Sequence, residues 1–170
     1  MDAYKTIISR VEVRDFQDRP IPDEALHRML QAGRMSGSSK NTQPWTFIVI
    51  RERATLEALS KCGDFAQHLL GAALAIAVVF DPQFYRGEFD TGRSAQNMML
   101  AAWADGIGSC IASMHREDEA RNVLGVPHTL RLQHVISFGY PVYETNGSIK
   151  RSSPLRGRKP LTEIVRHEKW

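Results

Sequence analysis

The sequence predicts an α/β or α+β sandwich in a single domain spanning residues 1–170. Helical and strand patterns alternate along the chain, which is typical of a sheet covered by helices and unlike a helix bundle or a barrel. A chain of 170 residues is long enough to bury a core within one domain. Apolar residues make up 42% of the chain and charged residues 24%, a balance that excludes wholesale disorder.

Two helices are expected before the first strand. The apolar spacing of residues 2–10 fits a short helix. The turn Pro20–Asp23 leads into a second helix, which presents Leu26 and Met29 on one face. That helix should end before the polar loop at residues 36–41.

Four short apolar runs are expected to form buried strands. They are rich in β-branched, aromatic and small apolar residues and cover residues 45–50, 75–80, 107–112 and 132–138. Continuous apolar character of this kind is typical of strands that are covered on both faces. Turn-forming sequences stop the second run at Asp81-Pro82 and the fourth at Gly139-Tyr140-Pro141.

Helical spacing predicts the segments between these strands. The expected helices cover residues 53–61, 64–71, 90–105 and 116–124. The pattern is strongest over residues 90–105, where Ala95, Met99 and Trp103 share one face and Gly106 ends the helix. A short amphipathic segment is expected at residues 161–165.

The formal net charge of +3 arises from one segment near the C-terminus. Residues 145–160 contain Lys150, Arg151, Arg156, Arg158 and Lys159 and no acid, so the rest of the chain sums to 3 − 5 = −2. We expect residues 145–170 to form a basic arm and tail. Residues 145–160 contain no aromatic side chain, whereas proteins that bind single-stranded nucleic acid interleave aromatic and basic residues, so no nucleic-acid partner is expected.

Several other kinds of site lack a sequence signature. Cys62 and Cys110 have no CxxC companion, which argues against a zinc ribbon, a disulfide scaffold or a thioredoxin-type motif. The histidines form no HExxH or HxH pattern, so no metal site is expected, and neither a GxSxG elbow nor a P-loop is present. No secretory signal is visible, and no apolar run approaches the roughly 20 residues that a membrane span needs. We expect a cytoplasmic protein with no membrane partner.

Two N-terminal segments could bind an anion or a flat polar ring. In an extended chain, Arg10, Glu12 and Arg14 would lie on one side and could offer two guanidinium groups to a phosphate or a flavin carbonyl. Spacing alone favours a simpler arrangement, a solvated helix end with an Arg–Glu pair. Residues 38–45 carry amides and hydroxyls that suit the pyrimidine edge of a flavin or a base, although a capping loop is the commoner explanation.

Two further segments have the same double interpretation. Ile111–Met114 lies at a strand end, where backbone N–H groups could face a ligand or simply terminate the strand. The cations at residues 150–151 and 156–159 could bind an anion or form a solvated tail.

Taken in order, these segments resemble the nitroreductase family of FMN-dependent oxidoreductases. The family's opening Arg-Arg-Ser-x-Arg is matched in part by Arg10–Arg14, and its Pro-Ser-x-x-Asn-x-Gln-Pro-Trp is similar to residues 38–45. Residues 96–102, followed by a Gly-Ile-Gly turn, are similar to the family's central dimer helix. Residues 138–141 and 158–161 match its Gly-Tyr-Pro and Arg-Lys-Pro-Leu elements, so the resemblance covers nearly the whole chain.

The resemblance implies an α+β fold, a nitroreductase-like α/β/α sandwich with a central, mainly antiparallel sheet, built as an intertwined homodimer with FMN at the interface. It implies an enzyme, an FMN-dependent NAD(P)H oxidoreductase, with NADH or NADPH as reductant and a nitroaromatic, a quinone or a similar small molecule as acceptor. FMN would carry the chemistry, so no catalytic side chain is expected. The segment Phe84–Phe89 is the expected substrate lid, and an aromatic packing loop is an equal alternative.

The resemblance also assigns cofactor contacts to individual residues. Three cations would hold the FMN phosphate: Arg10, Arg156 and Arg158. Arg14 would approach the N1–C2=O edge of the isoalloxazine, and Gln67 would lie at the pyrimidine edge. Flavin N5 would lie near the backbone of Ala112, Ser113 and Met114. The opposite subunit would contribute Ser38, Ser39, Asn41 and Gln43.

The chain departs from the family's pattern at its opening segment. Val11 and Glu12 stand where the family has its second Arg and its Ser, and Gly37 stands where it has Pro. An acidic side chain beside a phosphate is unfavourable unless Arg10 or Arg14 neutralises it. Two alternatives stay open: another flavin-dependent reaction, such as dehalogenation or flavin breakdown, and a non-catalytic nucleotide-binding protein.

Overall fold

A computed structural model describes residues 2–143 and 157–170 of the chain. Within these residues one sheet has the strand order β1-β2-β4-β3, and every neighbouring pair is antiparallel. The strands are β1 (Trp45–Ile50), β2 (Leu74–Phe80), β3 (Gly108–Ser113) and β4 (Arg131–Gly139). All four strands expected from the sequence are therefore confirmed, each to within about two residues at its ends.

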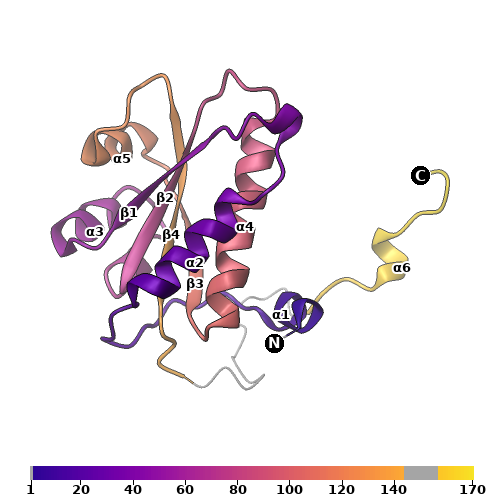
Figure 1. Cartoon of the computed structure of the whole chain (residues 1–170), viewed down its shortest axis with the longest axis horizontal. Helices are drawn as coiled ribbons and strands as arrows, with labels where there is room; N and C mark the ends of the chain where they lie inside the picture. The colour runs from indigo at the N-terminus through magenta and orange to yellow at the C-terminus, as the bar shows by residue number, and fades with distance from the viewer. Residues whose placement is uncertain (1, 144–156) are drawn as a thin grey trace.

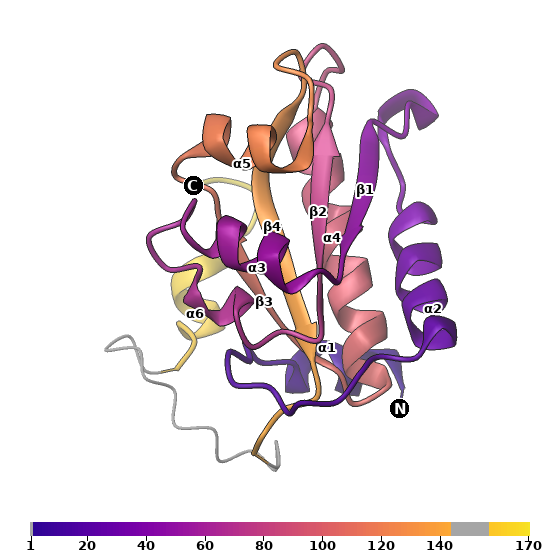
Figure 2. The same ribbon diagram turned by 90° about the vertical axis from the view of Figure 1, so that its left-hand side faces the viewer.

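Helices cover both faces of this sheet and complete three layers (Figures 1 and 2). One face packs against α2 (Asp23–Arg34) and α4 (Gly87–Ala104), and the other against α3 (Arg53–Ser60) and α5 (Glu117–Leu124). The expected α/β/α sandwich with a mainly antiparallel sheet is confirmed.

Strand β2 divides the core into two clusters. All of its residues are buried. Ile76 and Val78 belong to the cluster under α2 and α4, whereas Ala77 and Val79 belong to the cluster under α3 and α5. Successive side chains of a strand point to opposite faces, so a strand covered on both faces needs an unbroken apolar sequence.

The chain between α1 (Ala3–Ser9) and α2 runs in extended form along the outer edge of the sheet. Glu12 forms a parallel bridge with Ser109 of β3, and the backbone N–H of Val13 donates to the Ser109 carbonyl at 2.9 Å. Val13 is buried while Arg14 is exposed, which is the alternation that an extended segment produces. The edge of β3 is thereby covered for part of its length.

The helix expected over residues 64–71 is wrong in extent. Only η2 (Gln67–Leu69), a single turn of 3-10 helix, forms there. The backbone of residues 62–64, just before this turn, bonds instead to the segment that follows β3. The Asp64 N–H donates to His115 Nδ1 at 3.1 Å, and the Cys62 carbonyl accepts from the Arg116 N–H at 2.9 Å. A Cβ on Gly63 would lie 2.4 Å from the Ser113 carbonyl oxygen, so the two segments approach more closely than a side chain would allow.

The C-terminal segment lies apart from the sandwich. Its helix α6 (Leu161–Ile164) is separate from the sheet and its covering helices in Figure 1. Leu161, Ile164 and Trp170 are all exposed. No helix among residues 2–143 and 157–170 is long and apolar enough to cross a membrane. Lys150, Arg151 and Arg156 lie outside the described residues.

Candidate functional site

Three of the predicted segments meet around strand β3 and form what we call the β3 site. The extended segment Arg10–Arg14 runs beside Ser109, and the loop that carries Gln67 packs on the turn after β3. The third segment, Ala112–Met114, is the end of β3 itself and its continuation. These segments are far apart in sequence, and the pairing of β3 with its neighbours brings them together.

The two guanidinium groups of the β3 site are held differently. Arg10 Nη2 donates to Glu12 Oε1 at 2.6 Å, and Arg10 Nη1 donates to the Val11 carbonyl at 3.4 Å. Arg14 is exposed and makes no hydrogen bond or ion pair with any residue that the structure describes. Both sequence interpretations of this segment therefore hold in part: it is extended with its charges on one side, and it contains an Arg–Glu pair.

A buried histidine lies beneath these charges. His68 Nδ1 is 2.8 Å from Ser137 Oγ, which also bonds the Cys110 carbonyl at 3.2 Å. A carbonyl can only accept, so we assign the hydroxyl proton to that bond and the N–H donor to His68 Nδ1. His68 Nε2 is then a buried acceptor with no partner among the described residues.

Burial and charge keep the groups under the β3 site neutral. Burial, with the positive charge of Arg14 as the second cause, lowers the pKa of His68 to about 4. Burial also raises the pKa of the Cys110 thiol to about 12, so this thiol is not a nucleophile near neutral pH. The site therefore offers cations at its rim and neutral groups beneath them.

The end of β3 alternates in burial. Ala112 and Met114 are buried, whereas the side chain of Ser113 is exposed. The Met114 N–H donates to the Gln133 carbonyl at 2.8 Å and is therefore already used within the fold. Gln67 is exposed on η2. Gln67 and Ser113 are thus the exposed, uncharged polar groups of the β3 site.

The predicted residues Ser38, Ser39, Asn41 and Gln43 lie together elsewhere, in the loop between α2 and β1. Lys40, Asn41 and Gln43 have positive φ angles of 52°, 56° and 48°, a conformation that costs non-glycine residues about 1 kcal/mol or more each. Side-chain bonds hold this loop, since Ser38 Oγ accepts from the Gln43 N–H at 2.9 Å.

Helix α4 anchors the same loop at its N-terminal half. The Ser39 N–H donates to Asp90 Oδ2 at 2.7 Å, and Asn97 Nδ2 donates to Ser36 Oγ at 2.6 Å. The other end of α4 contacts α1 near the β3 site, where Trp103 Nε1 donates to Ser9 Oγ at 2.9 Å. Thirteen residues separate Asp90 from Trp103, so the contacts of α4 with the 38–43 loop and with α1 lie about 20 Å apart along the helix.

The remaining predicted contacts belong to the C-terminal arm. Arg158 is exposed and precedes α6, and it makes no ion pair with the described residues. Arg156 lies outside the described residues. The structure therefore brings Arg10, Arg14, Gln67 and Ala112–Met114 together in one chain and leaves the loop of residues 38–43 and Arg158 away from them.

Sequence reasoning missed the residues that surround α4. Asp90 is only 2% exposed, yet nothing in the sequence marked it as the anchor of the 38–43 loop. Arg86, Phe89 and Arg93 line an open groove of about 800 Å³ on the same helix. Phe89 and Arg93 are four residues apart, and this spacing in the sequence could have predicted that they lie side by side on one face of the helix. Phe84–Phe89 is not one loop, because α4 begins at Gly87.

Comparison with known proteins places the fold in a family. The model of the nitroreductase family matches residues 7–81 and 66–140. A relative from Archaeoglobus fulgidus, provisionally named NADH dehydrogenase/NAD(P)H nitroreductase, is 34% identical over 149 residues, which cover 82% of this chain and 86% of the relative.

Solved structures agree with this match. A nitroreductase family protein from Clostridium difficile 630 has a TM-score of 0.86 at 27% identity and covers 100% of both chains. An FMN-dependent nitroreductase from Clostridium difficile R20291 has a TM-score of 0.78 at 27% identity, over 83% of this chain and 88% of that one. The resemblance read from the sequence is thus confirmed, and the chain belongs to the nitroreductase family.

Proposed function

We propose that this protein is an FMN-dependent oxidoreductase that moves electrons from NADH or NADPH to a nitroaromatic, a quinone or a similar small acceptor. Family membership and the names of its relatives support this assignment. The observation that carries it is that the extended Arg10–Arg14 segment and the loop that carries Gln67 both pack against β3 and the turn after it. The expected cytosolic location stays a prediction.

The β3 site fits FMN in its chemistry. A phosphate and the electron-rich N1–C2=O edge of a flavin both require cations, and the site has Arg10 and Arg14 at its rim. The polar edge of the ring requires uncharged hydrogen-bonding groups, and Gln67 and Ser113 are exposed there. The unpartnered acceptor at His68 Nε2 also marks a place where a ligand or a water molecule would complete the hydrogen bonding.

The chain's own residues would bind and orient the cofactor. FMN, when bound, supplies the redox chemistry by accepting two electrons from NAD(P)H and passing them to the acceptor. The guanidinium of Arg14 would stabilise negative charge at the N1–C2=O edge, because a fixed cation needs no reorganisation when charge develops. The backbone of Ala112–Met114 would border N5. No side chain is required as a nucleophile.

A homodimer would complete the site. Within one chain the loop of residues 38–43 is bonded to Asp90 of α4, whereas α1, which precedes Arg10, contacts Trp103 about 20 Å further along that helix. A second copy, related by a two-fold axis, could place its own 38–43 loop against the first copy's β3 site. In this proposal Ser38, Ser39, Asn41 and Gln43 contact the FMN of the partner chain, and Arg156 and Arg158 reach the phosphate from the arm.

A spectroscopic experiment tests the function. The purified protein is expected to absorb visible light as a flavoprotein, to bleach anaerobically with NADH or NADPH, and to recover its colour when a quinone or a nitroaromatic is added. A protein that takes up no FMN from solution would contradict the cofactor. A flavoprotein that neither pyridine nucleotide bleaches would contradict the reductase assignment alone.

A further inference from the structure

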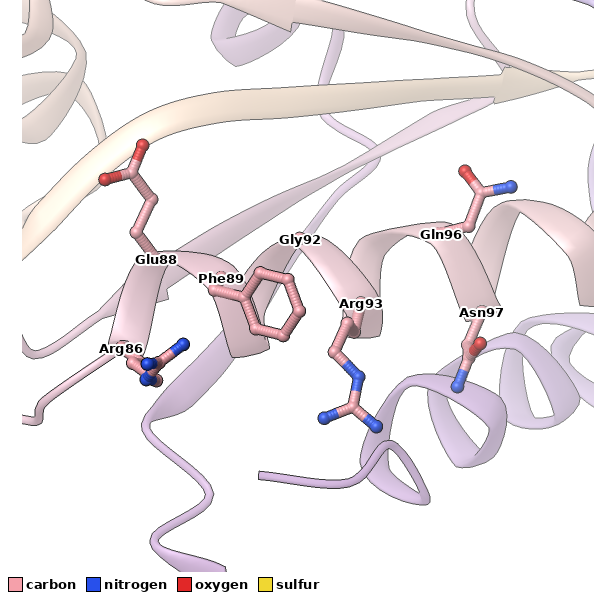
Figure 3. A pocket seen from close by; sticks show the side chains of 7 residues that line it. All are labelled: Arg86, Glu88, Phe89, Gly92, Arg93, Gln96 and Asn97. Carbon is pink, nitrogen blue, oxygen red and sulfur yellow. The ribbon is translucent and has the colours of Figure 1, made fainter. Parts of the chain in front are cut away.

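The groove along the N-terminal half of α4 has no role in the proposed cofactor contacts. We call it the α4 groove, and it has a volume of about 800 Å³. Figure 3 shows the residues that line it: Arg86, Glu88, Phe89, Gly92, Arg93, Gln96 and Asn97. Glu88 and Gln96 point to one side of the helix, Arg93 and Asn97 point to the other, and Phe89 lies between them (Figure 3).

The groove offers an aromatic surface at its centre. The side chain of Phe89 is 63% exposed and belongs to the lining of the groove, so its ring is accessible to a ligand there. Gly92 follows it at the groove wall and has no side chain, and a Cβ there would meet nothing within 4 Å. The Arg93 guanidinium carbon lies 5.9 Å from the centroid of the Phe89 ring, so an acceptor ring stacked on Phe89 would lie beside this cation.

Two cations flank this aromatic surface, and neither is fully neutralised. Arg86 is exposed and has no acidic partner among the described residues; its guanidinium carbon lies 5.0 Å from the centroid of the Tyr85 ring. Arg93 Nη1 is 3.5 Å from Asp90 Oδ1, but the other oxygen of that carboxylate accepts from the Ser39 N–H. The second acid of the groove, Glu88, faces β4. The hydrogen bond from Glu117 raises the pKa of Arg131, with a smaller contribution from Glu88, whereas burial lowers the pKa of His134 against the opposing charges of Glu88 and Glu117.

The groove is attached to the loop that the proposed function places at the partner's FMN. A Cβ on Gly37 would lie 2.8 Å from Arg93 Nη2, so the guanidinium lies directly against the start of that loop. Asp90 and Asn97 bond the loop as well. If the 38–43 loop of one chain binds at the β3 site of a second chain, the α4 groove of the first chain would therefore lie beside that site.

We propose that the α4 groove binds the electron acceptor and selects aromatic acceptors that carry a carboxylate or a sulfonate. Phe89 stacks against the acceptor ring, while Arg86 and Arg93 pair with its acidic group. Guanidinium groups match planar carboxylates and sulfonates through paired N–H donors, and a neutral acceptor would leave these donors unused. This inference rests on the proposed reductase function, since it names the substrate class of that enzyme.

The test compares two acceptors of nearly the same shape, 4-nitrobenzoate and 4-nitrobenzamide, with the FMN-loaded enzyme. We expect Arg86→Gln to lower kcat/KM for the benzoate about threefold, and the double variant Arg86→Gln/Arg93→Gln about tenfold, with the benzamide value changed less than about twofold. The ratio between the two acceptors cancels any general loss of activity. Arg86→Gln leaves the contact between Arg93 and Asp90 intact. This single variant therefore measures the effect of the groove's charge on acceptor selectivity even if the double variant disturbs the 38–43 loop.

Direct binding gives a second measurement. The dissociation constant of 4-nitrobenzoate, from calorimetric titration of the oxidised holoenzyme, should rise by a similar factor in the variants. Arg51→Gln is the matched control, because Arg51 pairs with exposed Asp23 and does not line the groove. It should leave both acceptors unaffected.

The outcomes separate the inference from the function on which it rests. Turnover with an unchanged benzoate-to-benzamide ratio would refute the groove and leave the reductase intact. A rise in the KM of NADH or NADPH alone would show that the cations bind the reductant and would overturn the assignment. Absence of flavin reduction would refute the proposed function, and the inference would fall with it.

Discussion

The ion pair between Arg10 and Glu12 determines how far Arg10 is available to an anionic ligand. Arg10 Nη2 and Glu12 Oε1 are 2.6 Å apart, the Arg10 side chain is only 15% exposed, and the second carboxylate oxygen of Glu12 is buried with no hydrogen-bond partner in the part of the chain that the structure describes. A phosphate at Arg10 would have to share its guanidinium with this carboxylate. A carboxylate held beside a phosphate also repels it, so Glu12 should weaken FMN binding.

Replacing Glu12 tests this competition. We expect Glu12→Ser, which restores the family's residue, to tighten FMN binding about tenfold, because it frees Arg10 and removes the repulsion. The measurement is the dissociation constant from quenching of FMN fluorescence. Asp15→Asn is the control, since Asp15 is an exposed acid of the same segment with no ion pair to Arg10. Equal or weaker binding by Glu12→Ser would show that Glu12 itself supports the cofactor.

His68 makes the stability of the fold depend on pH. Its pKa is about 4 in the folded chain and about 6.5 when exposed, so the unfolded chain binds the extra proton first as the pH falls. The contribution is complete above about pH 6.5 and is lost between there and about pH 4. The free energy of unfolding should fall by about 1 kcal/mol per pH unit across this window because of His68 alone.

The variant His68→Asn should make the free energy of unfolding less dependent on pH while it keeps a polar partner for Ser137. Urea denaturation at about pH 7 and about pH 5 measures this free energy. From the higher to the lower pH, the wild type should lose about 2 kcal/mol more of it than the variant does. The lowered pKa of His134 acts in both proteins, so the difference isolates His68. His27→Asn, on the exposed side of α2, should behave as the wild type does.

Among the helices, α4 connects both halves of the proposed site. Its first turn contains Asp90, which is 2% exposed and accepts the Ser39 N–H at 2.7 Å. A carboxylate in this position also interacts favourably with the positive end of the helix dipole. Asp90 therefore holds the loop of residues 38–43 against α4 in a conformation that its positive φ angles make costly.

Removing this carboxylate should release the loop. We expect Asp90→Ala to lower the free energy of unfolding by about 2 kcal/mol, because a charge-assisted hydrogen bond and a helix-end charge are both lost. Amide hydrogen exchange should also lose protection at Ser39. Glu88→Ala removes an exposed acid from the same turn, and its cost should stay below about 0.5 kcal/mol. Equal losses in the two variants would mean that only the helix end, and not the loop contact, is involved.

The elements of this fold were predictable where periodicity decides them. The run of residues 74–80 and the face shared by Ala95, Met99 and Trp103 carry their structure in their apolar spacing. Residues 64–71 did not form the predicted helix. Asp64 instead donates its N–H to His115, and only single 3-10 turns, such as the Leu70 N–H to the Gln67 carbonyl, form after it. The α4 groove was not predictable from the sequence either, because a groove forms only where the chain is folded in three dimensions.

At the scale of the whole molecule, two elements outside the sandwich, α1 and the C-terminal arm, expose large apolar side chains. Leu161 and Ile164 of the arm are 73% and 61% exposed, and Ile7 and Ile8 of α1 are 56% and 61% exposed. Unpartnered apolar surface on separate elements of this kind favours association with another chain. A two-fold dimer would cover both and would also bring a 38–43 loop to each β3 site.

Complementation between two defective chains tests whether each FMN site is built from both copies. Arg14→Ala damages the β3 site and Gln43→Ala damages the loop, so a mixed dimer has one site with both defects and one with neither. Heterodimers purified through two different tags should therefore retain about half an FMN per chain, while either homodimer retains far less. Sedimentation should show two chains of 19.2 kDa in every species.

The matched control pairs Arg14→Ala with Arg10→Ala. Both substitutions fall in the β3 site, so every site of that heterodimer carries one defect and none should recover. Recovery in the first pair and not in the second would follow only if the loop crosses to the other chain. An equal FMN content in both pairs would place the loop and the β3 site in the same chain and would contradict a site shared between two copies.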